Sequence, residues 1–140
     1  MLDKSEKLFV NKLINVLKRE YDHEIKLDNK INETCKFIED YFSELKNELK
    51  NIINISDGDI EVETRNSSNI IAKIDIFKNE LSFQKSETGI CVNLKRDDGT
   101  QERIDYINCE STEVNINEYK LNEILETAFE DVFDNLKNSQ

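Results

Sequence analysis

Four carboxylates recur at helical spacing near the end of the chain. Glu123, Glu126, Glu130 and Asp134 are separated by steps of three, four and four residues. Residues three and four apart share one face of a helix, so this spacing predicts a continuous acidic stripe. Like charges at this spacing destabilise a helix by roughly 0.2–0.5 kcal/mol per pair, a cost that a basic partner would offset. The stripe has two interpretations: a solvated face, or a patch for a basic surface that includes local mimicry of a nucleic-acid backbone.

The residue types that most often carry catalysis are scattered. His23 is the one histidine and has no cysteine near it in the sequence, so a zinc site would need ligands from distant elements. The closest approach to the acid and lysine pair of metal-dependent nucleases is Asp75 with Lys78, whose three-residue spacing places the two side chains on opposite faces of a strand. We therefore predict no catalytic residue, no cofactor and no metal site, and do not expect an enzyme.

The charge and composition limit the partners of this chain. Its 140 residues carry a formal charge of −11. This charge argues against direct binding of nucleic acid, which needs clustered basic residues, and favours a basic partner. No stretch approaches the roughly 18–20 apolar residues of a membrane span, and charges interrupt the N-terminus where a signal peptide needs an apolar core. We expect a cytoplasmic protein without membrane contact, and the abundance of Lys, Asn and Ile suggests a low-GC bacterium or its phages.

Hydrophobic periodicity predicts two helices in the N-terminal part of the chain. Apolar residues recur every third or fourth position over 4–20 and again over 28–54, and the second segment is long for a helix of a small domain. The polar residues 22–26 between them predict a link. Asp28 is placed to cap the second helix.

The second predicted helix carries more apolar surface than one seam requires. Its seam runs from Ile31 to Ile52, whereas Phe37 and Tyr41 form an i,i+4 pair about 80–120° away around the helix. If the first helix covers that flank, the aromatic pair is buried within the chain. If it does not, the pair forms a partner surface, or a homodimer contact through 28–54. Both alternatives stay open at this point.

Over residues 58–110, apolar residues recur at every second position instead of every third or fourth. Five alternating segments are separated by short turn clusters rich in Gly and Asp, which predicts an antiparallel meander. In the second segment, Ile71 and Phe77 are expected to point opposite to the other apolar residues. Either both faces of the sheet are covered, or its outer face carries an apolar patch.

The last part of the chain predicts a third helix over 116–137, with Asn115 as its N-cap. The element order is then α-α-β-β-β-β-β-α, and the simplest packing is a two-layer α+β sandwich with the helices on one face of the sheet. We expect one domain over 1–140, made of a helical pair at 1–55, a sheet at 58–110 and a C-terminal helix at 115–138.

Small size, acidity and the lack of a catalytic pattern are typical of interaction proteins. We predict a module that binds and occludes or chaperones a larger basic macromolecule, of the inhibitor, immunity or antitoxin type. The expected contact residues are Phe37, Tyr41, Glu123, Glu126, Glu130 and Asp134. The alternative function is small-ligand binding in a pocket between sheet and helices. That pocket would be lined by Phe83, Val92, Leu94 and Tyr106.

Overall fold

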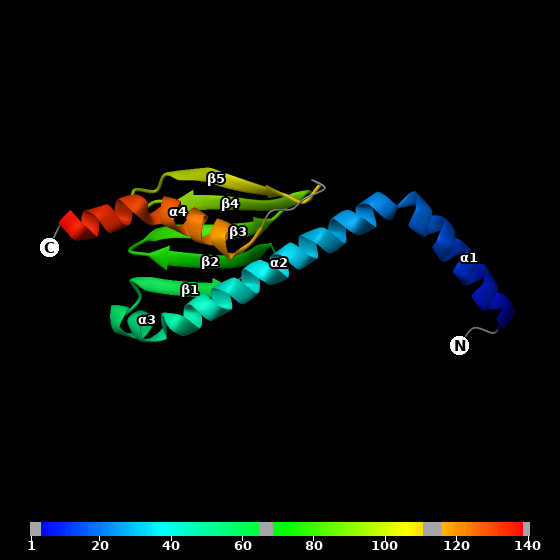
Figure 1. The fold of residues 1–140 in the computed structure, drawn as a ribbon, viewed down its shortest axis with the longest axis horizontal. Coiled ribbons are helices and arrows are strands. Elements are labelled where there is room, and N and C mark those ends of the chain that lie inside the picture. Colours follow the sequence, from blue (N-terminus) through cyan, green and yellow to red (C-terminus); the bar gives the residue numbers. More distant parts are fainter. Residues whose placement is uncertain (1–3, 65–68, 111–115, 139–140) are drawn as a thin grey trace.

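The fold is a five-stranded antiparallel sheet with helices packed on one face (Figure 1). A computed structural model describes residues 4–64, 69–110 and 116–138. The elements are α1 (Lys4–Glu20), α2 (Asp22–Glu48), α3 (Lys50–Ser56), β1 (Ile60–Thr64), β2 (Ile70–Ile76), β3 (Asn79–Lys85), β4 (Gly89–Lys95), β5 (Gln101–Asn108) and α4 (Glu118–Asn138). The strands lie in the sheet in chain order. The predicted α+β class, element order and meander are confirmed.

The link predicted at 22–26 is wrong, because these residues are helical. Backbone bonds cross the junction between α1 and α2: the Tyr21 amide donates to the Leu17 carbonyl, and the Ile25 amide to the Tyr21 carbonyl, each at 2.9 Å. Asp28 therefore lies inside α2 and caps nothing. The acidic and basic residues of the segment are compatible with a helix, and neither glycine nor proline interrupts it.

The helix predicted over 28–54 is divided near its end. Leu49 separates α2 from the short helix α3, although the Ile53 amide still donates to the Leu49 carbonyl at 2.9 Å. The predicted stop after this segment is confirmed, because Asp57 and Gly58 have positive φ angles of 52° and 95°. These left-handed residues end α3 and turn the chain into β1.

The core lies between the sheet and two helices, α2 and α4, which cross the same face of the strands (Figure 1). The rings of Phe42 in α2 and Phe83 in β3 meet edge to face, with 5.3 Å between their centroids. Leu121 and Phe129 on α4 are also buried, so α4 closes the other half of the sheet. Burial of these apolar surfaces from two helices and five strands is what holds the layers together.

A bulge corrects the predicted alternation of β2. Ile70 pairs with Gln84 and Ala72 pairs with Phe83, so Ile71 is an extra residue in the ladder. Ile71 is buried in the same cluster as Ala72. Ile71 is therefore part of the core and requires no cover on the outer face, because the bulge shifts it to the inner side of the sheet.

The outer face of the sheet is polar where the structure describes it. Lys73 lies between two carboxylates, with its Nζ 3.0 Å from Glu80 and 3.7 Å from Glu63. The hydrogen bond to Glu80 raises the pKa of Lys73, so this cation stays charged at neutral pH. The helices α2 and α4 both lie on the other face (Figure 1), so this face meets solvent along its described strands.

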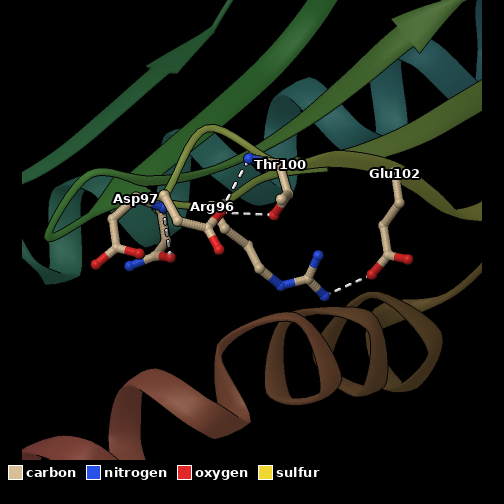
Figure 2. Close-up of polar contacts among 6 residues, drawn as sticks. Arg96, Asp97, Thr100 and Glu102 are labelled. Atoms are coloured by element: carbon tan, nitrogen blue, oxygen red, sulfur yellow. Dashed lines mark hydrogen bonds and ion pairs between the residues drawn. The ribbon is translucent and has the colours of Figure 1, made fainter.

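Two hairpin turns close the strands at one end of the sheet. In the predicted turn before β5, the Gly99 amide donates to the Arg96 carbonyl at 2.9 Å, and Gly99 has a φ of 90°. The Asp98 carboxylate accepts bonds from the Thr100 amide and hydroxyl, which lower the pKa of Asp98 (Figure 2). Arg96 forms an ion pair with Glu102 beside this turn. The predicted hairpin is confirmed.

The turn between β2 and β3 is less regular in its sequence. Phe77 and Lys78 both have positive φ angles, 50° and 68°, in a tight turn that usually takes Asn and Gly. The Lys78 amide donates to Asp75 Oδ1 at 3.0 Å, and the Asn79 carboxamide oxygen accepts from the Asp97 amide of the neighbouring hairpin. Phe77 is thus a turn residue and does not extend the apolar face of β2.

The C-terminal helix begins at Glu118, and the Asn117 side chain accepts a bond from the Lys120 amide at 2.8 Å. Asn117 acts as the cap that the sequence placed at Asn115, a residue outside the described part of the chain.

Candidate protein-binding surfaces

The aromatic pair of α2 belongs largely to the core. Phe37 and Tyr41 are half-buried and pack against the core cluster. Burial raises the pKa of Tyr41, with Glu118 and Glu48 adding to the shift, which places the phenol near the start of α4. Phe37 and Ile116 line a shallow groove of about 280 Å³. The flank is therefore covered from the α4 side, not by α1, and a partner contact at this pair stays a prediction.

The acidic stripe is exposed along α4, with its four carboxylates facing solvent. The Asn122 amide donates to Glu126 at 3.4 Å. Among the described residues, no ion pair involves Glu123, Glu126, Glu130 or Asp134. The spacing thus produces a continuous acidic face, and its use by a partner stays a prediction.

The last turns of α4, residues 130–137, reach beyond the strands of the sheet (Figure 1); we call them the overhang. The last buried residue of α4 is Phe129, whereas Phe133 and Leu136 on the overhang are exposed. Asp131 adds a further exposed carboxylate. The overhang therefore combines apolar and acidic side chains on a helix that has little of its own chain around it.

Other exposed apolar residues lie at the same end of the molecule. Figure 1 places α3, the β2–β3 turn and the overhang together at the end opposite α1, and we call this group the distal end. Ile52 and Ile55 of α3 are 51% and 84% exposed, and Phe77 of the turn is 39% exposed. The Phe77 amide donates to the Asp59 carbonyl at 2.8 Å, which ties the turn to the segment after α3.

Most of the exposed large apolar residues lie on a projecting arm, residues 4–30, made of α1 and the first turns of α2 (Figure 1). The first buried residue of α2 is Ile31, so the arm stands outside the core. Leu8 and Phe9 are 70% and 68% exposed. Further exposed apolar residues of the arm are Leu13, Ile14, Val16, Leu17, Tyr21 and Ile25.

The periodicity of the sequence predicts α1 with its observed bounds, but does not distinguish it as a candidate site. All the apolar positions of α1 except Leu8 lie within an arc of about 160° on a helical wheel, the width typical of a helix packed on a core. That pattern alone cannot distinguish a helix covered by its own sheet from one that projects. The apolar side of α1 is exposed because α2 carries α1 away from the sheet (Figure 1).

The charge of the arm differs in sign from that of the rest of the molecule. The arm, residues 4–30, contains seven basic and five acidic residues, a formal charge of +2, and its helix α1 alone carries +3. Residues 31–140 carry a formal charge of −12. A basic, amphipathic helix is therefore attached to a strongly acidic body.

The predicted ligand pocket is not assembled as expected. Phe83, Val92 and Leu94 are buried in the core between sheet and helices. Tyr106 pairs with Cys91 on the opposite side of the sheet from Val92, and its hydroxyl contacts the Thr88 hydroxyl. The four residues therefore do not line one cavity, because the alternation of β5 turns Tyr106 away from the other three.

The remaining chemical candidates have ordinary structural surroundings. His23 is exposed on α2. Asp75 accepts the Lys78 amide within a turn, and burial raises the pKa of this carboxyl. No group of three His, Cys, Asp or Glu side chains suited to a metal ion occurs within the described ranges.

No known protein family, curated protein or solved structure matches this chain. Across the described helices, none is long and apolar enough to cross a membrane.

Proposed function

We propose that this chain is a protein-binding module that acts by covering a surface of a larger partner. The observation that carries the proposal is the exposed apolar face of the arm. Monomeric proteins seldom leave a contiguous apolar patch of more than a few hundred Å² in water, and larger patches mark sites of association. Leu13 and Leu17 lie near the middle of this face, one helical turn apart.

The expected partner has a basic surface. The acidic stripe of α4 supports this expectation, since its four carboxylates are exposed and have no ion pair among the described residues. The overall charge of −11 would speed association with a basic protein and repel nucleic acid. The proposal places the module in the cytoplasm, as an inhibitor, immunity protein, antitoxin or chaperone of bacterial or phage origin.

Charge reversal on the stripe tests the expected partner. Immobilised wild-type protein is compared with Glu126→Lys/Glu130→Lys in capture from the lysate of the source cells, at low and high salt. The reversal should lower capture at least about tenfold, because it replaces attraction by repulsion at the contact. The matched control is Glu87→Lys/Glu110→Lys, which makes the same change of charge at exposed positions outside α4.

Unchanged capture by the stripe variant would remove the acidic face from the proposal. Capture that survives in Leu13→Glu/Leu17→Glu would likewise remove the arm from the proposal, provided that both variants keep a cooperative thermal transition. Wild-type protein that captures no more than the bare support would contradict the binding function itself.

A further inference from the structure

The arm needs a covering surface to be a stable helix. An isolated helix of about 15 residues is marginal in water, and most helices gain their stability by packing an apolar face. The 17 residues of α1 touch the rest of the described chain mainly at the junction with α2. Leu13, Val16 and Leu17 are all more than 40% exposed. The missing contact must come from another molecule.

The distal end has the properties that would complement the arm. Its apolar residues Ile55 and Phe133 are exposed, as described above. The carboxylates of Glu130, Asp131 and Asp134 lie on the overhang beside Phe133 and face solvent. A helix with a basic polar face and an apolar face can therefore pack its leucines on the apolar residues while its lysines meet the carboxylates at the margins.

The arm and the distal end lie at opposite ends of the molecule (Figure 1). One chain therefore cannot bring its own arm to its own distal end. A second copy turned end for end by a twofold rotation presents its distal end to the first arm, and its arm to the first distal end. Such an exchange forms two equal interfaces and leaves none open, which gives a closed dimer instead of a filament.

We propose that the arm of one copy binds the distal end of a second copy, so that the protein is an arm-exchanged homodimer. This inference rests on the proposed function, because it names a second copy of the chain as one basic partner of the α4 surface. Charge complementarity selects this occupant: the helix α1, with a formal charge of +3, meets a body, residues 31–140, with a formal charge of −12. Glu20 lies within the apolar arc of α1 and the acidic body would be repelled by anionic lipid, so a membrane fits the arm less well.

Complementation between two variants tests the exchange. The arm variant is Leu13→Glu/Leu17→Glu and the distal variant is Glu130→Lys/Asp134→Lys, and each mass is measured by sedimentation velocity over a concentration series. All four positions are exposed, so the fold should survive, and circular dichroism with a thermal melt checks this. Wild type should be a dimer, and each variant alone should have its dissociation constant raised at least about tenfold.

An equimolar mixture of the two variants is the decisive sample. The arm variant still has an intact distal end and the distal variant an intact arm, so the mixture should form heterodimers through one native interface. The variant Glu87→Lys/Glu110→Lys should dimerise like wild type. A distal variant that remains a full dimer would indicate arm-to-arm pairing and overturn the proposal, as would a mixture that stays monomeric.

A wild type that is still monomeric at about 100 µM would also overturn the exchange, because the dissociation constant of the dimer would then be larger than a specific dimer requires. Sedimentation of that monomer with anionic phospholipid vesicles would assign the arm to a membrane surface. Neither result decides the proposed function, which fails separately if the wild-type protein captures no partner.

Discussion

The two ends of α2 have different surroundings. From Ile31 onward the helix lies on the sheet, and Ile38 and Phe42 are fully buried. Before Ile31 the same helix projects with α1, and both Tyr21 at the junction and Ile25 in α2 are about half exposed. Periodicity thus specifies which side of a helix is apolar, whereas the position of the sheet decides whether that side is covered. The body obtains its stability from its own layers, and the arm must obtain it from a second molecule.

Truncating one phenylalanine in each region gives the largest expected contrast. Phe42→Ala removes a fully buried ring that packs on Phe83, and should lower the free energy of unfolding by about 3–5 kcal/mol. Phe9→Ala removes an exposed ring of the arm and should change the free energy of unfolding of the monomer by less than about 0.5 kcal/mol. Urea unfolding, followed at low protein concentration to avoid association, measures both.

Equal losses from the two truncations would contradict the division into body and arm. In that case Phe9 would have to be buried in the folded monomer.

A pair of glycine substitutions sharpens the description of the body. A Cβ at Gly89 would lie 2.0 Å from the Ile107 carbonyl oxygen, so Gly89→Ala must separate β4 from β5 and should cost about 2 kcal/mol or more. Gly99→Ala meets no neighbour within 4 Å and is disfavoured only by its φ of 90°, which should cost about 1 kcal/mol. Thermal melting of both variants shows which substitution lowers the stability more. A reversed order would indicate that the β4–β5 pairing is looser than the structure has it.

A pH-dependent comparison gives the smallest expected effect. Burial raises the pKa of Asp75 above its ordinary value of 3.8, with Glu80 adding to the increase and Lys73 opposing it. A raised pKa in the folded state means that this group stabilises the protein below pH 3.8 and loses that contribution as pH rises through the folded value. Asp75→Asn keeps an acceptor for the Lys78 amide and removes the charge of this half-buried side chain.

The free energy of unfolding of the Asp75→Asn variant should therefore exceed that of the wild type at pH 7 by up to about 0.5 kcal/mol, measured from thermal melts. The difference should shrink as pH is lowered toward 4, because the wild-type carboxyl then becomes neutral. A difference in stability that grows as the pH is lowered would contradict a raised pKa of Asp75 in the folded protein. The arm contributes nothing to this pH dependence if it is independent of the body.

The sequence was sufficient for the elements whose apolar period is regular. It predicted α1 with its observed bounds, as well as the five strands and the hairpin at Gly99, because local pattern and turn chemistry agree there. It failed at 22–26, where a charged segment without glycine or proline continues as helix. It also failed at Ile71, because a bulge depends on the register of the neighbouring strand.

The candidate surfaces were predictable to different degrees. The exposure of Glu126 and Glu130 followed from the helical period of α4, since its opposite face is apolar. The core position of Phe37 and Tyr41 depended on where α4 begins to pack, which no local pattern contains. The exposure of the arm was missed for the same reason: it is determined by the direction in which α2 leaves the sheet.

The continuous helix over 22–30 joins α1 to the body by a helical connection instead of a flexible linker. A helical connection has fewer conformations to lose than a flexible linker when α1 docks, so more of the contact energy appears as affinity. It also couples direction to length, because each residue added to a helix turns what precedes it by about 100° and moves it by about 1.5 Å. One residue inserted in this stretch would aim the apolar face of α1 away from its present side. Seven would return it to nearly the same side, at a greater reach.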